Sequence, residues 1–148
     1  MRDSNGNWVA GFSAFIGHGN SLTAELWRIT KGVELALSLN YKHLIIETDS
    51  LVSKNLLTSS AALPHHPLST LIANCRFLTM QLDDFKIQHV LREANSCVDA
   101  LANHGRTKQL HFTVFDSLPP FLSLLFHQDY LEVGVIRRPK SLYARKPP

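Results

Sequence analysis

Two long stretches of the chain carry apolar residues at helical spacing. The first runs from about residue 21 to residue 40, and its apolar positions are Leu22, Leu26, Ile29, Val33, Ala36 and Leu37. The second covers residues 68–82, and one stripe of it consists of Leu68, Leu71, Ile72, Cys75, Leu78, Thr79 and Leu82. Because residues three or four apart share one face of a helix, both stretches predict amphipathic helices packed on a core.

Other segments have the patterns of strands. Residues 44–46 (Leu-Ile-Ile) form an unbroken apolar run, which predicts a strand buried on both faces. Residues 85–91 alternate between apolar and polar, as in a half-exposed strand at an edge. Residues 8–16 alternate in part and follow Asn5-Gly6, a strong hairpin signal. Only two residues precede that turn, so we expect a strand upstream of residue 1.

Shorter elements complete an α/β pattern. Ser50 is a plausible N-cap for a helix over residues 51–57. A helix over residues 95–105 would be capped by Asn95 or Ser96, closed by Gly105, and buried on the side of Val98, Leu101 and Ala102. Residues 111–115 predict a short strand, and residues 121–131 a packed apolar segment. Strands that alternate with helices in this way indicate an α/β fold.

Composition and charge narrow the class of protein. The 148 residues are 45% apolar and 18% charged, as in a globular domain. No apolar run reaches membrane length, and no apolar segment follows the first charges, so we expect an intracellular protein of the nucleus or cytoplasm. Cys75 and Cys97 match neither a zinc site nor a disulfide framework. The net charge of +3 permits a polyanionic partner, and much of the excess lies in Arg137, Arg138, Lys140, Arg145 and Lys146.

Three acidic residues occupy related places in the predicted elements. Asp49 follows the apolar strand, Glu25 lies near the start of the first long helix, and Asp99 lies near the start of the helix over residues 95–105. Asp49 and Glu25, each taken alone, are also explained by the helix dipole, which favours acids in first turns. Ligands in open α/β sheets, however, bind beyond the carboxyl ends of strands. Right-handed connections would bring all three acids to one such rim.

Three clustered carboxylates repel one another unless a cation is bound. Mg²⁺ prefers carboxylate oxygens and retains waters for substrate phosphates, and two such ions activate a water for phosphodiester cleavage. The small residues Gly32 and Ala36, on the same side as Glu25, predict that this helix lies close to a sheet. The pattern therefore supports a metal-dependent nuclease as one hypothesis.

Three segments, in this order, carry a family resemblance. They are residues 22–27 (LTAELW), 46–50 (IETDS) and 92–102 (REANSCVDALA). Together they resemble the type 1 ribonuclease H domain, and within it the branch expanded in plants and associated with reverse-transcriptase-like genes. Residues 2–8 are similar to the first hairpin of that branch, and residues from Pro119-Pro120 through Gly134 to its C-terminal extension. The resemblance covers about residues 1–138.

The resemblance implies a ribonuclease H-like fold, with a mixed five-stranded sheet flanked by helices, and metal-dependent hydrolysis of RNA in RNA–DNA hybrids. It makes Glu25, Asp49 and Asp99 three of the four metal-binding carboxylates, with Mg²⁺ or Mn²⁺ as cofactor. It places Asn95 near the active-site loop, and we assign Asn95 and Ser50 to substrate binding. His89 falls inside the predicted strand over residues 85–91, either as a catalytic histidine or as an ordinary strand residue.

The fourth carboxylate of the family lies on its first strand, which the resemblance places before residue 1, so we expect an N-terminally truncated domain. We predict a ribonuclease H-like domain over residues 1–106, an extension over 107–138 and a disordered basic tail over 139–148. Two functions follow. The chain is either an active hybrid nuclease or a catalytically silent nucleic-acid-binding or interaction domain.

Overall fold

The computed structural model describes residues 1–17, 19–91 and 96–128, and the chain divides into two compact units. Unit 1 contains residues 1–17, 91 and 96–128 of the described chain, and unit 2 contains residues 19–90. Each unit has its own hydrophobic core. Asn95 and the predicted basic tail lie outside the described residues, and the predicted domain boundaries stay predictions.

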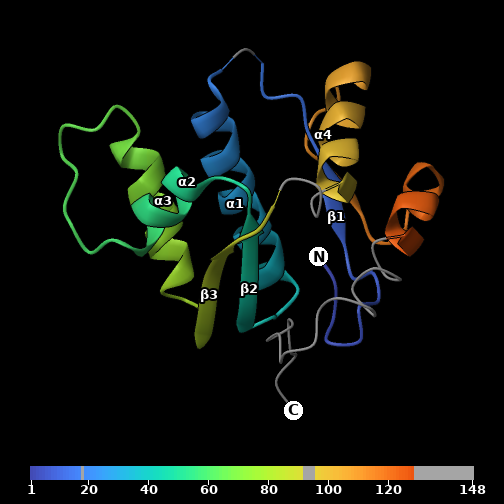
Figure 1. Cartoon of the computed structure of the whole chain (residues 1–148), viewed down its shortest axis with the longest axis horizontal. Helices are drawn as coiled ribbons and strands as arrows, with labels where there is room; N and C mark the ends of the chain where they lie inside the picture. Colours follow the sequence, from blue (N-terminus) through green and yellow to red (C-terminus); the bar gives the residue numbers. More distant parts are fainter. Residues whose placement is uncertain (18, 92–95, 129–148) are drawn as a thin grey trace. The chain divides into compact units, whose positions relative to one another are not determined.

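Unit 2 joins three helices to a pair of parallel strands. Its elements are α1 (Ser21–Ser38), β2 (His43–Thr48), α2 (Leu51–Thr58), α3 (Ser69–Thr79) and β3 (Asp84–His89). Strands β2 and β3 lie side by side, in a register that places His43 opposite Asp84 and Thr48 opposite His89 (Figure 1). The carboxyl ends of both strands therefore meet at one edge, where ligands bind in open α/β sheets.

The core of unit 2 confirms both predicted helical stripes. Leu26 and Val33 of α1 and Ile72 and Cys75 of α3 are at most 1% exposed, and they cluster with Ile87 of β3. Helix α1 begins at Ser21, where the side chain of Asn20 accepts a hydrogen bond from the backbone N–H of Thr23 at 2.8 Å. The core cluster of apolar side chains holds α1 and α3 together on the strand pair.

Two expectations about this sheet are wrong. Residues 44–46 are half-buried rather than buried on both faces, because among the described strands β2 pairs with β3 alone. Gly32 makes no close approach, since a Cβ built there would meet nothing within 4 Å. Ala36 is fully buried, as expected for the sheet-facing side of α1.

Unit 1 packs α4 (Ser96–Lys108) with an antiparallel pair, β1 (Gly11–Ser13) and β4 (Thr113–Phe115). The predicted N-terminal turn is present, with Gly6 at φ 82° and a bridge between Arg2 and Trp8. A 3-10 turn (Pro120–Leu122) and helical residues 123–128 supply the packed apolar segment. The core residues of unit 1 are Cys97, Leu101, Leu122 and Phe126.

The end of α4 differs from its prediction. The helix continues past Gly105 to Lys108, and Gly105 is buried inside it. A Cβ at Gly105 would lie 2.8 Å from the backbone N and O of Ala14, so this glycine permits close packing on the chain after β1. Ala102, expected on the buried side, is exposed.

Within the described residues, no helix has the length and apolar character needed to cross a membrane.

Candidate functional site

Thr48 connects α1 to the end of β2. Its side chain is completely buried, and its hydroxyl donates a hydrogen bond to Oε1 of Glu25 at 2.5 Å. The Thr48 hydroxyl oxygen also accepts a hydrogen bond from the backbone N–H of Ser50 at 3.1 Å. Glu25 is only 6% exposed, and Asp49 follows Thr48 directly. The structure therefore brings the Glu25 carboxylate to the strand end that bears Asp49.

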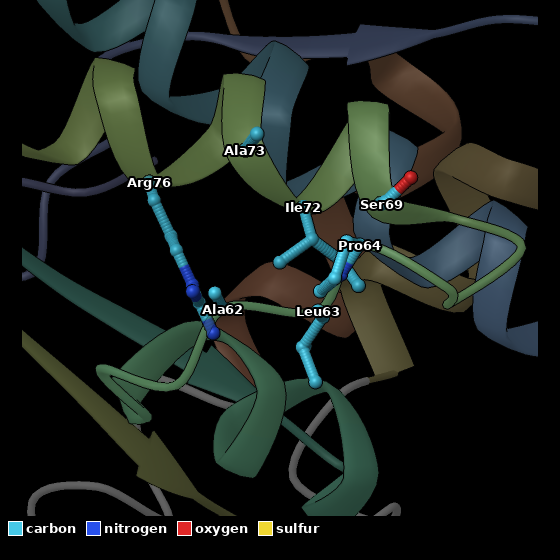
Figure 2. A pocket seen from close by; sticks show the side chains of 7 residues that line it. All are labelled: Ala62, Leu63, Pro64, Ser69, Ile72, Ala73 and Arg76. Carbon is cyan, nitrogen blue, oxygen red and sulfur yellow. The ribbon is translucent and has the colours of Figure 1, made fainter.

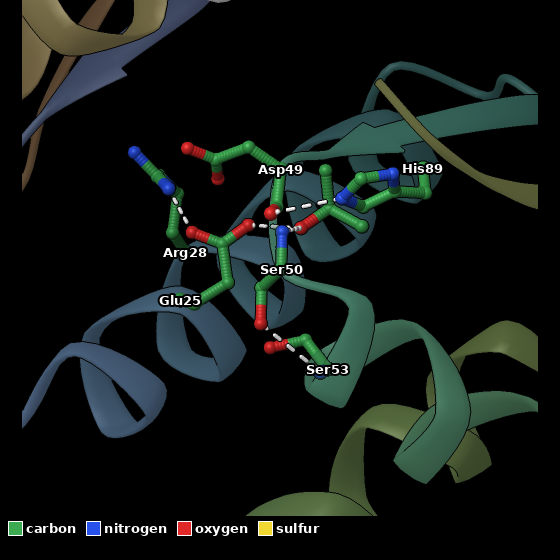
Figure 3. Close-up of polar contacts among 7 residues, drawn as sticks. Glu25, Arg28, Asp49, Ser50, Ser53 and His89 are labelled. Atoms are coloured by element: carbon green, nitrogen blue, oxygen red, sulfur yellow. Dashed lines mark hydrogen bonds and ion pairs between the residues drawn. The ribbon is translucent and has the colours of Figure 1, made fainter. Parts of the chain in front are cut away.

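Arg28 occupies the other oxygen of Glu25. Its Nη2 donates to Glu25 Oε2 in an ion pair across one turn of α1 (Figure 3). A buried carboxylate that keeps its charge requires a compensating cation. Arg28 provides that cation, and both Glu25 oxygens are satisfied by the protein itself. The i,i+3 spacing of the two residues is the signal by which the sequence could have revealed this pair.

The turn that carries Asp49 is held by the start of α2 and by the end of β3. Ser50 Oγ accepts from the backbone N–H of Ser53 at 3.1 Å, which confirms Ser50 as the N-cap of α2. His89 Nε2 lies 3.2 Å from the backbone oxygen of Asp49. The Asp49 side chain is half-buried, and in Figure 3 its carboxylate points away from His89, to the side on which Arg28 and Glu25 lie.

His89 is the last residue of β3 and is exposed. This position agrees with its prediction as a strand residue, and its contact is with backbone rather than with an acidic side chain. A catalytic part for His89 stays a prediction.

Two further residues, Asp99 and Asn95, were predicted to belong to the site. Asp99 belongs to unit 1, in the first turn of α4, and is exposed. Its assignment to one site with Glu25 and Asp49 stays a prediction that rests on the sequence. Asn95 lies outside the described residues. Within the described residues of each unit, no three His, Cys, Asp or Glu side chains gather closely enough to hold a metal ion.

A separate depression in unit 2, of about 290 Å³, lies between α3 and the loop before it (Figure 2). Its lining is mainly apolar, and its one charged residue is Arg76. The Arg76 guanidinium donates to the carbonyls of Leu56 (2.6 and 3.1 Å) and Ala61 (2.8 Å), which ties the loop to α3. None of the predicted acids lines this depression, so we do not assign it to the candidate site.

Two solved structures define the class of protein to which this arrangement belongs. Ribonuclease H1 of the archaeon Halobacterium salinarum is similar with a TM-score of 0.59 and 26% identity, over 64% of this chain and 72% of that chain. The N-terminal ribonuclease H domain of a Mycobacterium tuberculosis protein, solved as a fusion with maltose-binding protein, is similar in fold. Its TM-score is 0.58 at 17% identity, over 68% of this chain and 92% of that chain. The chain has a ribonuclease H fold of the mixed α/β class.

Sequence comparison gives the family. Residues 1–105 match the model of the reverse transcriptase-like family, and the chain belongs to that family. An Arabidopsis thaliana protein that is provisionally named a ribonuclease H protein is 35% identical over 131 residues, or 88% of this chain. The aligned part is 21% of that relative, so the chain spans about a fifth of its length. These findings confirm the family resemblance predicted from the three motifs.

Proposed function

We propose that this chain hydrolyses the RNA strand of RNA–DNA hybrids, with Mg²⁺ or Mn²⁺ held by Glu25, Asp49 and Asp99. The observation that supports the proposal most directly is the buried Glu25 carboxylate, fixed by Thr48 at the strand end that bears Asp49. Carboxylate oxygens are the ligands that such hard cations prefer. A metal bound there would lower the pKa of a water and stabilise charge on the phosphate.

The surrounding residues would keep the two carboxylates of unit 2 in place. Thr48 orients Glu25 through its hydroxyl, and the Ser50 cap fixes the turn that carries Asp49. Ser50 and Asn95, by their places in the sequence, would contact the hybrid backbone. Recognition in this class would depend on duplex shape and 2′-hydroxyl groups, so we expect little dependence on base sequence.

Cleavage of a labelled RNA–DNA hybrid in Mg²⁺ or Mn²⁺ tests the proposal. Asp49→Asn should reduce the cleavage rate by about 100-fold or more, because loss of a positioned catalytic group commonly costs that much. Asp83→Asn is the matched control, since Asp83 is exposed and lies just before β3, at the other end of the strand pair. Cleavage by Asp49→Asn at the unmodified rate would contradict the proposed role of Asp49.

A second candidate function is a catalytically silent nucleic-acid-binding domain. The Arg28–Glu25 ion pair favours it, because a carboxylate already neutralised by the protein has less need of a metal. Hybrid binding without cleavage, by both the unmodified chain and Asp49→Asn, would support this alternative.

A further inference from the structure

The two oxygens of Glu25 have partners of different kinds. Oε1 accepts from Thr48, which is completely buried, ends β2 and also accepts from the N–H of Ser50. Oε2 accepts from Arg28, whose side chain is 29% exposed against 7% for Glu25. Thr48 is thus fixed by the strand, whereas Arg28 is a long side chain with access to water.

This difference determines which partner is replaceable. Moving Thr48 would disrupt the end of β2 and the turn to α2, whereas Arg28 has a long side chain that reaches solvent. A divalent cation at Glu25 Oε2 would share that oxygen with the guanidinium, and the two positive charges would repel each other. Arg28 and a divalent cation therefore compete for one buried carboxylate oxygen.

We infer that Arg28 is an internal counter-ion that occupies the cation's place on Glu25 and weakens the binding of divalent cations by this chain. The inference rests on the proposed function, because it concerns the same carboxylate. Arg28 also stabilises the cation-free protein, since an unpaired buried carboxylate would be costly.

The same helix contains a matched control pair. Lys31 donates to Glu34 Oε2 at 2.6 Å, also across three residues, but these side chains are 32% and 37% exposed. Lys31→Gln removes one positive charge from α1 close to Arg28, without removing a partner of Glu25. A general charge effect would act in both variants, whereas competition at Glu25 would act only in Arg28→Gln.

Calorimetric titration with Mn²⁺ measures the competition directly, on the full chain and on Arg28→Gln, Arg28→Lys, Lys31→Gln and Glu25→Gln. Arg28→Gln should bind Mn²⁺ about tenfold more tightly than the unmodified chain, because a partly screened unit charge beside the ligand is removed. Arg28→Lys, which keeps the charge, and Lys31→Gln should stay within about twofold of the unmodified chain. Glu25→Gln should lose most of the binding.

Thermal unfolding provides a second measurement. Without metal, Arg28→Gln should unfold at a lower temperature than the unmodified chain, and saturating Mn²⁺ should raise its midpoint by more than it raises the midpoint of the unmodified chain. If Arg28→Gln folds only with Mn²⁺ present, that result also supports the inference.

The outcomes separate the two proposals. Equal or weaker Mn²⁺ binding by Arg28→Gln, while the unmodified chain binds Mn²⁺ and cleaves hybrid, would overturn the counter-ion inference and leave the nuclease proposal standing. Absence of Mn²⁺ binding and of cleavage in every variant would overturn both.

Discussion

At the scale of single residues, the Thr48 hydroxyl joins the two parts of the candidate site, because it donates to Glu25 and accepts from the backbone N–H of Ser50. Thr48→Val keeps the shape of the side chain, but it leaves Glu25 Oε1 without its donor and the Ser50 N–H without its acceptor. The variant should lose about 1–3 kcal/mol in the free energy of unfolding, the usual cost of unpaired buried polar groups. Urea unfolding measures this, with Thr48→Ser as the control that keeps the hydroxyl. Equal stability of all three proteins would show that the contact contributes nothing.

Single residues also show what the sequence could and could not predict. Glu25 and Asp49 were candidates from their places at a helix start and a strand end, and the family resemblance of their segments made them predicted metal ligands. Thr48 is an ordinary strand residue by sequence, and only the packing of α1 on β2 makes it a donor to Glu25. That contact joins residues 23 positions apart, and no local pattern encodes it.

Asp3 gives a pH-dependent prediction. Its carboxylate accepts from the side chain of Asn7 (3.0 Å) and from the backbone N–H groups of Asn7 (2.9 Å) and Asn5 (2.8 Å), and these bonds lower the pKa of Asp3 below its ordinary value of 3.8. The folded state thus favours the ionised form, so the stabilisation is present above the ordinary pKa and is lost as pH falls through the lowered one.

The difference in thermal midpoint between the unmodified chain and Asp3→Asn should therefore be largest above about pH 5 and shrink from about pH 4 downward. Unfolding curves collected across this range measure it. A difference that stays constant with pH would contradict the linkage.

At the scale of elements, two helical glycines should respond in opposite directions to the same substitution. Gly105→Ala would force a Cβ to within 2.8 Å of the backbone of Ala14, and should lose about 1–3 kcal/mol of stability from overpacking. Gly32→Ala meets open space in α1 and should gain about 0.5–1 kcal/mol from helix propensity. Chemical unfolding of both variants tests the pair. Destabilisation by Gly32→Ala would contradict the open environment at that position.

The helices were predicted better from the sequence than the strands were. The stripes of α1 and α3 are local patterns, and the structure confirms them within a few residues. The burial of β2 depends on which strands pair with it, and Gly105 resembles a helix end until its contact with Ala14 is known. Pairing and close approach join distant parts of the chain, so periodicity alone could not predict them.

At the scale of the whole molecule, positive charge is unevenly distributed along the sequence. Five of the 15 basic residues and two of the 12 acidic residues lie in residues 129–148, so the preceding 128 residues carry no formal net charge. A neutral body would attract a polyanion only weakly at long range. If the chain binds hybrids as proposed, its basic C-terminal residues should therefore contribute much of the salt-dependent affinity.

Replacing Arg137, Arg138, Lys140, Arg145 and Lys146 by Gln tests this without shortening the chain. Each lost phosphate contact reduces the magnitude of the slope of log affinity against log salt by about 0.9, so five contacts would reduce it by up to about 4.5. Fluorescence anisotropy with a labelled hybrid at several salt concentrations measures the slope, and Asp49→Asn, which leaves these charges unchanged, is the control. Under the proposed function the carboxylates would act in cleavage and the basic residues in attraction, so saturating hybrid should restore the cleavage rate of the Gln variant. An unchanged slope would place the phosphate contacts in residues 1–136.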